Sequence, residues 1–203
     1  MIRRPNRQHD HRGVRRPGGV RSAGVPAIAG PVREFRCVPA TVGLDAEVRT
    51  ASAGRVLVDA LAAPYDRLSH PLGTFRERIR PGAFRSALRP GADVLALWQH
   101  DQSRPLARTT AGTLRLRDSA AGLRALIELP ATTWGTDAAE AIRSGTVTSM
   151  SFGFVAVEER IDGRRSDDGL PIRELVSVDL FEISPVTFPA YGDTSAVASS
   201  GGA

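Results

Sequence analysis

The sequence predicts an α+β fold, a strand-rich mixed sheet or barrel with short helices at its periphery. Residues 112–118 and 123–130 alternate apolar and polar side chains around a "SAAG" turn, as the strands of a β-hairpin do. Residues 146–161 and 172–189 form two long strand-like segments, the second interrupted by Pro185 and the two joined by a polar loop. Helical patterns are short and do not alternate with the strands, so a βαβ repeat is not expected.

The remaining elements are shorter. Residues 31–63 are irregular, with strand-like pieces at "VREFRCV" and "GRVLVDALAA". Residues 82–90 predict a short helix that a proline ends. Residues 93–100 predict a buried strand that finishes in a polar pair. In residues 136–145, a threonine at the cap position, an alanine-rich body and a final glycine predict a second helix.

We expect three parts in this chain of 203 residues: an arm (1–30), one domain (31–192) and a flexible tail of small residues (193–203). The net charge of +5 belongs to the arm. It holds seven arginines and one acid, so it carries +6 and the other 173 residues sum to −1. A basic arm can contact nucleic acid or an acidic protein surface. The alternative is a solvated, disordered leader.

Cysteine use and hydropathy predict a soluble, intracellular protein. Cys37 is the only cysteine, so no disulfide can form within the chain, which fits a reducing compartment. No apolar run approaches the roughly 20 residues of a membrane helix. The stretch "GVPAIAG" is too short and too proline-interrupted for a signal peptide. One cysteine and four scattered histidines make no metal-ligand cluster, and no cofactor is expected.

His100 is the candidate general base. His9 and His11 lie in the basic arm and His70 in a loop rich in glycine and proline, whereas His100 ends a hydrophobic strand. Strand ends are where rigid scaffolds present side chains to a cleft, and histidine suits proton transfer near neutral pH. The alternative is a partly exposed histidine beside a turn. Asp101 would point away from its neighbour and help to make that turn.

The string "SMSFGF" (149–154) is the candidate nucleophile segment. Because alternate residues of a strand share a face, Ser149 and Ser151 lie with a glycine on one side, and the methionine and two phenylalanines lie on the other. The small face can present a hydroxyl and lets another backbone approach closely. The alternative is a small face packed beneath another element. The string is not the G-x-S-x-G elbow of α/β-hydrolases.

Glu182 is the candidate acid. It lies inside the apolar strand "DLFEISPV", where a carboxylate is costly unless it is paired or functional, whereas Asp179 is nearer the polar start of the strand. A structural, hydrogen-bonding acid is the alternative. The resulting chain order of histidine, serine and acid is none of the familiar hydrolase orders.

Four segments together resemble the tailed-phage prohead protease family, the capsid maturation serine proteases. They are "FRERIRPGAF" (75–84), "LALWQHDQSRPLAR" (95–108), "GLRALIELPATTWGTDAAEAIRSGTVTSMSFGF" (122–154) and "LFEISPVTFPAY" (180–191). The resemblance extends over about residues 50–192, with the four segments in the family's order and spacing. It implies a serine endopeptidase whose fold is similar to herpesvirus assemblin, a β-barrel ringed by helices.

The resemblance also implies site residues. The family's histidine, serine and acid fall on His100, Ser151 and Glu182. Ser149 stands where relatives usually have glycine, which places a second hydroxyl on the presenting face. Smaller departures are Gln99 for the usual asparagine and alanine for the usual glycine before Arg108, and a loop near that arginine is a candidate source of oxyanion donors.

The implied partner is the major capsid protein, whose scaffolding region would be cut inside the assembling phage prohead in the cytoplasm of the bacterial host. Self-cleavage and self-association inside the prohead are also implied. No membrane partner is expected, and no nucleic acid beyond the basic arm. Two other readings stay open: a non-catalytic capsid assembly or scaffold protein of the same fold, and a nucleic-acid binder acting through the arm, whose affinity would depend on salt.

Overall fold

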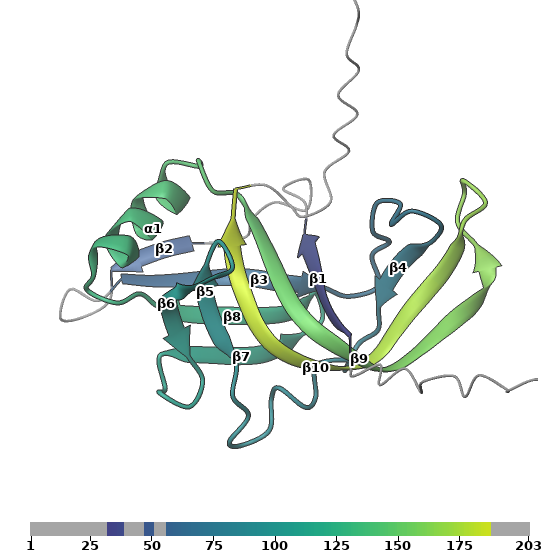
Figure 1. Ribbon diagram of the computed structural model, residues 1–203, viewed down its shortest axis with the longest axis horizontal. Helices are drawn as coiled ribbons and strands as arrows, with labels where there is room; N and C mark the ends of the chain where they lie inside the picture. Colours follow the sequence, from purple (N-terminus) through teal and green to yellow (C-terminus); the bar gives the residue numbers. More distant parts are fainter. Residues whose placement is uncertain (1–31, 39–46, 51–55, 188–203) are drawn as a thin grey trace, which may run out of the picture. The chain divides into compact units, whose positions relative to one another are not determined.

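The computed structural model describes residues 32–38, 47–50 and 56–187, which form ten strands in two sheets and one α-helix (Figure 1). The elements in chain order are β1 (Arg33–Val38), β2 (Glu47–Thr50), β3 (Val56–Pro64), β4 (Arg76–Ile79), β5 (Leu95–Trp98), β6 (Asp101–Arg108), β7 (Leu114–Ser119), β8 (Gly122–Glu128), α1 (Thr133–Arg143), β9 (Ser149–Arg165) and β10 (Pro171–Val186). The predicted arm and tail lie outside the described residues. The strand-rich class predicted from the sequence is confirmed.

The larger sheet is built on β9 and β10, which pair antiparallel over most of their 17 and 16 residues. β1 pairs with the free side of β9, and β5 and then β6 follow on the free side of β10. β4 and β5 run parallel to β10, next to different parts of it. β9 and β10 are strongly curved, so this sheet has the form of a half-barrel (Figure 1).

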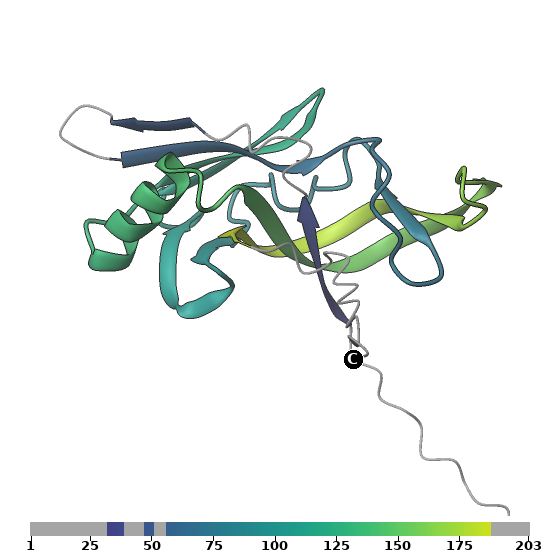
Figure 2. The same ribbon diagram turned by 90° about the horizontal axis from the view of Figure 1, so that it is seen from above.

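The smaller sheet has the order β2, β3, β8, β7, and every pair in it is antiparallel. It contains the β7–β8 hairpin that the alternating pattern predicted. The view in Figure 2 shows the two sheets as separate layers. In such a pair of layers the side chains of the two inner faces form the core.

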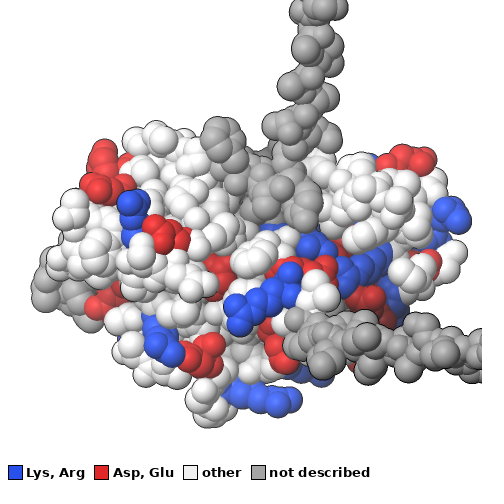
Figure 3. Space-filling view, viewed as in Figure 1, with Lys and Arg blue, Asp and Glu red and all other residues white. Residues whose placement is uncertain are grey.

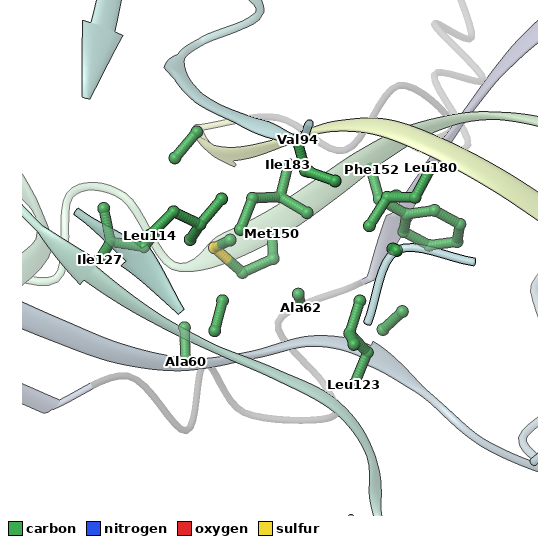
Figure 4. Close-up of a cluster of buried hydrophobic side chains, with 14 of the residues drawn as sticks. Ala60, Ala62, Val94, Leu114, Leu123, Ile127, Met150, Phe152, Leu180 and Ile183 are labelled. Carbon is green, nitrogen blue, oxygen red and sulfur yellow. The ribbon is translucent and has the colours of Figure 1, made fainter. Parts of the chain in front are cut away.

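The core lies between these inner faces (Figure 4). Met150, Phe152 and Phe154 on β9 are at most 1% exposed, as their predicted position on the apolar face requires. Across from them the smaller sheet contributes buried aliphatic residues such as Ala60 and Ile127. Burying this face of β9 fixes which way its other face points, because a strand cannot slip by one residue without exposing its apolar set.

Helix α1 begins earlier than predicted. Thr132, not Thr136, is the N-cap, because its hydroxyl accepts the N–H of Gly135 at 3.3 Å. Thr136 instead lies in the first turn and donates its hydroxyl to the Thr132 carbonyl. The predicted end is close to that observed, with Ser144 as the C-cap.

The helix predicted over residues 82–90 is wrong. This segment forms consecutive turns with hydrogen bonds between residues three apart, for example from Ala87 N–H to the Phe84 carbonyl at 3.0 Å. Prolines flank the segment and Gly82 has a φ of +84°, so an α-helix has no room to start. The segment is held by the ring of Phe84, which is fully buried.

Three strands were not predicted: β2, β4 and β6. β2 and β4 have only four residues each, and β6 is mostly polar and contains a proline. The three segments therefore do not show the apolar alternation that predicts a strand. Pro185 was predicted to interrupt its strand but lies within β10 opposite Met150. Its carbonyl accepts the N–H of Gln99 at 3.2 Å, so the strand continues to make a backbone contact there.

In the described part of the chain, no helix is long and apolar enough to cross a membrane. On the face shown in Figure 3, the described acidic and basic side chains are interspersed and do not form a patch of one sign.

Candidate active site

Gln99 and His100 form the two-residue loop of the β5–β6 hairpin, between the paired residues Trp98 and Asp101. Both have positive φ, 55° and 62°. Two positive φ values define a type I′ turn, which favours asparagine and glycine, so this sequence adopts the turn at a cost. Asp101, the first residue of β6, accepts the N–H and hydroxyl of Ser103.

Contacts with the end of β10 hold this turn. The Gln99 side chain makes two hydrogen bonds with Thr187, one from its amide nitrogen at 2.8 Å and one to its amide oxygen at 3.2 Å. The backbone N–H of His100 donates to the Ser184 hydroxyl at 3.3 Å. These hydrogen bonds fix the backbone of the turn and so help to position the imidazole of His100.

His100 and Glu182 are in direct contact: Nδ1 of the ring lies 2.6 Å from Oε1 of the carboxylate. Glu182 is 3% exposed, and its other oxygen accepts the Ser184 hydroxyl at 2.6 Å. A carboxylate accepts hydrogen bonds, so Nδ1 carries the proton in this contact and the neutral ring keeps Nε2 as its acceptor. That tautomer is the one a general base requires.

A β-bulge explains why Glu182 faces this side of the sheet. The β9–β10 register shifts between Leu180 and Glu182, so that Glu182, and not Phe181, is paired with Gly153. Bulges re-aim side chains and are frequent beside active sites. Without the shift, Glu182 would fall on the core side of β10.

Ser151 lies on the same face of the sheet, one pair along. It is paired with Ser184, the residue that bonds Glu182, whereas Ser149 is paired with Val186, one alternate position further from Glu182. Ser151 is fully buried, and its hydroxyl donates to the carbonyl oxygen of Arg36 at 3.2 Å. The structure thus joins His100 and Glu182 directly, and the strand register puts Ser151 on the same face of the sheet, two residues from the Gly153 that pairs with Glu182.

β1 lies beside β9 as the edge strand of the same sheet. Its pairing with β9 sets Cys37 opposite Ser151 and Phe35 opposite Gly153. The Phe35 ring makes edge-to-face contacts with His100, at 5.1 Å between centroids, and with Phe181 at 5.7 Å.

Next to these rings is a cleft of about 720 Å³, lined by His100, Leu72, Phe75 and residues 32–36. A cleft of about 1160 Å³ lies elsewhere, between α1 and the β5–β6 hairpin. The second cleft is larger, but it is lined by none of His100, Ser151 and Glu182. The first cleft is therefore the better candidate for the active-site cleft.

A buried charge network anchors β1. The Arg36 guanidinium binds Glu77 through two hydrogen bonds of 2.7 and 2.9 Å, and Arg173 bonds both Glu77 and Glu34. Burial raises the pKa of Glu77, against the lowering effect of Arg36. The hydrogen bond from Arg173 lowers the pKa of Glu34. Breaking one member of such a network would leave a buried charge without its partner.

Sequence reasoning missed Ser184, although its spacing of two from Glu182 on one strand gave a usable signal. The strand-like piece at "VREFRCV" was predicted, but its pairing with β9 beside the site was not, because the local sequence gives no signal for it. The loop near Arg108 was suggested for oxyanion donors, but the Arg108 backbone N–H is already bonded to the Thr113 hydroxyl. Its side chain binds Asp93.

A buried carboxylate in contact with a histidine, on a sheet face that also carries Ser149 and Ser151, has the residue types that serine proteases use. The family model described as Caudovirus prohead serine protease matches residues 44–202, so the chain belongs to that family. Among curated proteins, nothing matches the chain.

Among solved structures, the bacteriophage T4 capsid assembly protease, gp21, is similar over 74% of this chain and 98% of its own, with a TM-score of 0.45 and 9% identity.

Proposed function

We propose that this chain is a capsid maturation endopeptidase with Ser151 as nucleophile, His100 as general base and Glu182 as the acid that orients the histidine. The observation that carries the proposal is the 2.6 Å contact between His100 and the buried Glu182, on the face of β9 and β10 that also bears Ser151. The family supports the reaction class, and this geometry supports the choice of residues.

The reaction follows from these positions. Nε2 of His100 takes the hydroxyl proton as Ser151 attacks a peptide carbonyl carbon, and it then gives that proton to the amine that leaves. Glu182 fixes the ring tautomer and stabilises the imidazolium that forms. Water then attacks the acyl group on Ser151 with His100 again as the base, which releases the acid product and restores the serine.

The substrate that fits the family is the scaffolding region of the major capsid protein, cut inside the assembling prohead in the bacterial cytoplasm. Self-cleavage and self-association belong to the same proposal. So does a fold of the herpesvirus assemblin kind, which the half-barrel of β9 and β10 supports in outline.

Ser151 is favoured over Ser149 because of the register. Ser151 is paired with the residue that bonds Glu182, whereas Ser149 is displaced toward the end of β10. Both are almost completely buried, so exposure does not separate them.

Co-expression with the major capsid protein tests the proposal, with the intact mass of both proteins as the readout. Ser151→Ala should leave the capsid protein uncut, a loss of roughly 10⁴-fold or more for a missing triad member. Ser149→Ala, the matched control on the same face, should process normally. Normal processing by Ser151→Ala would refute the assignment, and an uncut capsid protein with the unmodified chain would favour the non-catalytic scaffold.

A further inference from the structure

β1 pairs with the edge of β9 along the part of β9 that contains Ser151. β1 is the terminal strand of its sheet, and it pairs in register with β9 from Arg33 to Val38. A strand edge without such a cover presents unpaired backbone groups, and an extended peptide can bind it as an added strand. β1 shows how a peptide lies on this edge.

β1 also brings a peptide carbonyl to the serine. The Arg36 carbonyl oxygen accepts the Ser151 hydroxyl at 3.2 Å, and the Ser151 side chain is fully buried in this arrangement. A serine nucleophile needs a substrate carbonyl group within this reach. While β1 is paired, no other peptide can take the same place beside Ser151.

The side chain one residue before Arg36 occupies an aromatic subsite. The Phe35 ring lies over Gly153 and contacts both His100 and Phe181. A Cβ at position 153 would come within 2.9 Å of the Phe35 ring and 2.6 Å of Phe181, so the absence of a side chain at Gly153 creates the space. A large apolar side chain fits this subsite.

The side chain of the residue that supplies the carbonyl meets a buried acid. Arg36 binds Glu77 through two parallel hydrogen bonds, the geometry in which arginine and a carboxylate recognise one another most specifically. Glu77 is 3% exposed and also bonds Arg173, which belongs to β10 and not to β1. Position 36 is therefore suited to a basic residue.

We propose that this edge of β9 is the substrate-binding site, an inference that rests on the proposed function. The site takes an extended peptide with a large apolar residue followed by arginine. β1 is an internal occupant of the site, and it covers Ser151 until it is displaced. The matched family region begins at residue 44, after β1 ends. β1 is thus an addition to the matched region and not one of its own strands.

The test measures how fast a fluorophosphonate probe labels Ser151, read by intact mass and peptide mapping. The unmodified full-length chain is compared with three variants. In the first, of equal length, residues 33–38 are replaced by Gly-Ser repeats, and the second is Phe35→Ala. The third, Val157→Ala, is a control at an exposed position of β9. We expect labelling to rise about tenfold or more on replacement and severalfold for Phe35→Ala, which loses two ring contacts. The control should match the unmodified chain.

A synthetic peptide of residues 32–38, VREFRCV, should then slow labelling of the replaced chain, and a scrambled peptide should not. Equal labelling of the replaced and unmodified chains, or no effect of the peptide, overturns the inference alone. If circular dichroism shows that the replaced chain is unfolded, an unchanged rate for Phe35→Ala overturns it. Absence of label on Ser151 in every folded chain overturns the proposed function, and the inference with it.

Discussion

The hydroxyl of Ser184 donates to Oε2 of Glu182 at 2.6 Å, while the other oxygen of that carboxylate contacts His100. Both serine and acid are buried, with Ser184 at 0% and Glu182 at 3% exposure. The same hydroxyl oxygen accepts the backbone N–H of His100. Ser184 is therefore a positioning residue, which ties the acid to the turn that carries the histidine.

Replacing Ser184 by alanine should slow capsid protein cleavage about 10- to 100-fold with little change in KM, because a hydrogen bond to a charged group contributes about 1.5–3 kcal/mol. Ser184→Thr keeps the hydroxyl and should recover most of the rate. Ser86→Ala is the control, since Ser86 also donates to β10, at the Val178 carbonyl. Steady-state kinetics on a capsid protein peptide give the comparison, and an unchanged rate for Ser184→Ala would rule out the positioning role.

Elements with a strong local pattern could be predicted from the sequence. The β7–β8 hairpin and the apolar face of β9 are set by alternation of side chains, which acts over a few residues. β4 could not be predicted in this way, because its pairing with the distant β10 and not its own side chains makes it a strand. β2 and β6 pair with their chain neighbours β3 and β5, but they are short or polar and show no apolar alternation. The segment at residues 82–90 failed because flanking prolines override its helical composition.

The site could be predicted only in part, for the same reason. His100, Ser151 and Glu182 were identifiable by residue type, strand position and family resemblance. The contact between Glu182 and His100 depends on the bulge that pairs Glu182 with Gly153, and a bulge shifts register without a clear sequence mark. The cover provided by β1 depends on Arg36 meeting Glu77, 41 residues away.

Gly153→Ala should impair binding of substrates with a large apolar residue in the subsite that Phe35 occupies. The new methyl group would lie 2.6 Å from Phe181, so a ring must move. Overpacking costs about 1–3 kcal/mol, which corresponds to a rise in KM of about 10- to 100-fold. Gly163→Ala is the matched control on β9, because nothing lies within 4 Å of a Cβ there.

The comparison should use two peptides that differ only at the position equivalent to Phe35, one with phenylalanine and one with alanine. The KM for the alanine peptide should change less in the Gly153→Ala chain. An equal change for both peptides would mean that the space over Gly153 does not select the side chain.

Phe152→Ala should lower the free energy of unfolding by about 3–5 kcal/mol, because it leaves a cavity in the core. Phe152 is 1% exposed and packs against Phe84 and Phe154 at centroid distances of 5.7 and 5.4 Å. Val157 on β9 is 60% exposed, so Val157→Ala should change the free energy of unfolding by less than about 0.5 kcal/mol. Urea denaturation measures both, and a small loss for Phe152→Ala would contradict the packing between the sheets.

The Asp93 carboxyl should titrate at a pKa of about 2, below its ordinary 3.8, chiefly because Arg108 donates hydrogen bonds to it. Since the folded-state pKa is the lower one, the pair stabilises the fold fully above pH 3.8 and loses this contribution as the pH falls through about 2. Arg108→Ala should return the pKa toward 3.8, whereas Arg104→Ala, which removes the partner of Asp101, should not. Side-chain carboxyl NMR across the acid range measures the titration, and a pKa of Asp93 that does not respond to Arg108→Ala would show that the pair does not persist in solution.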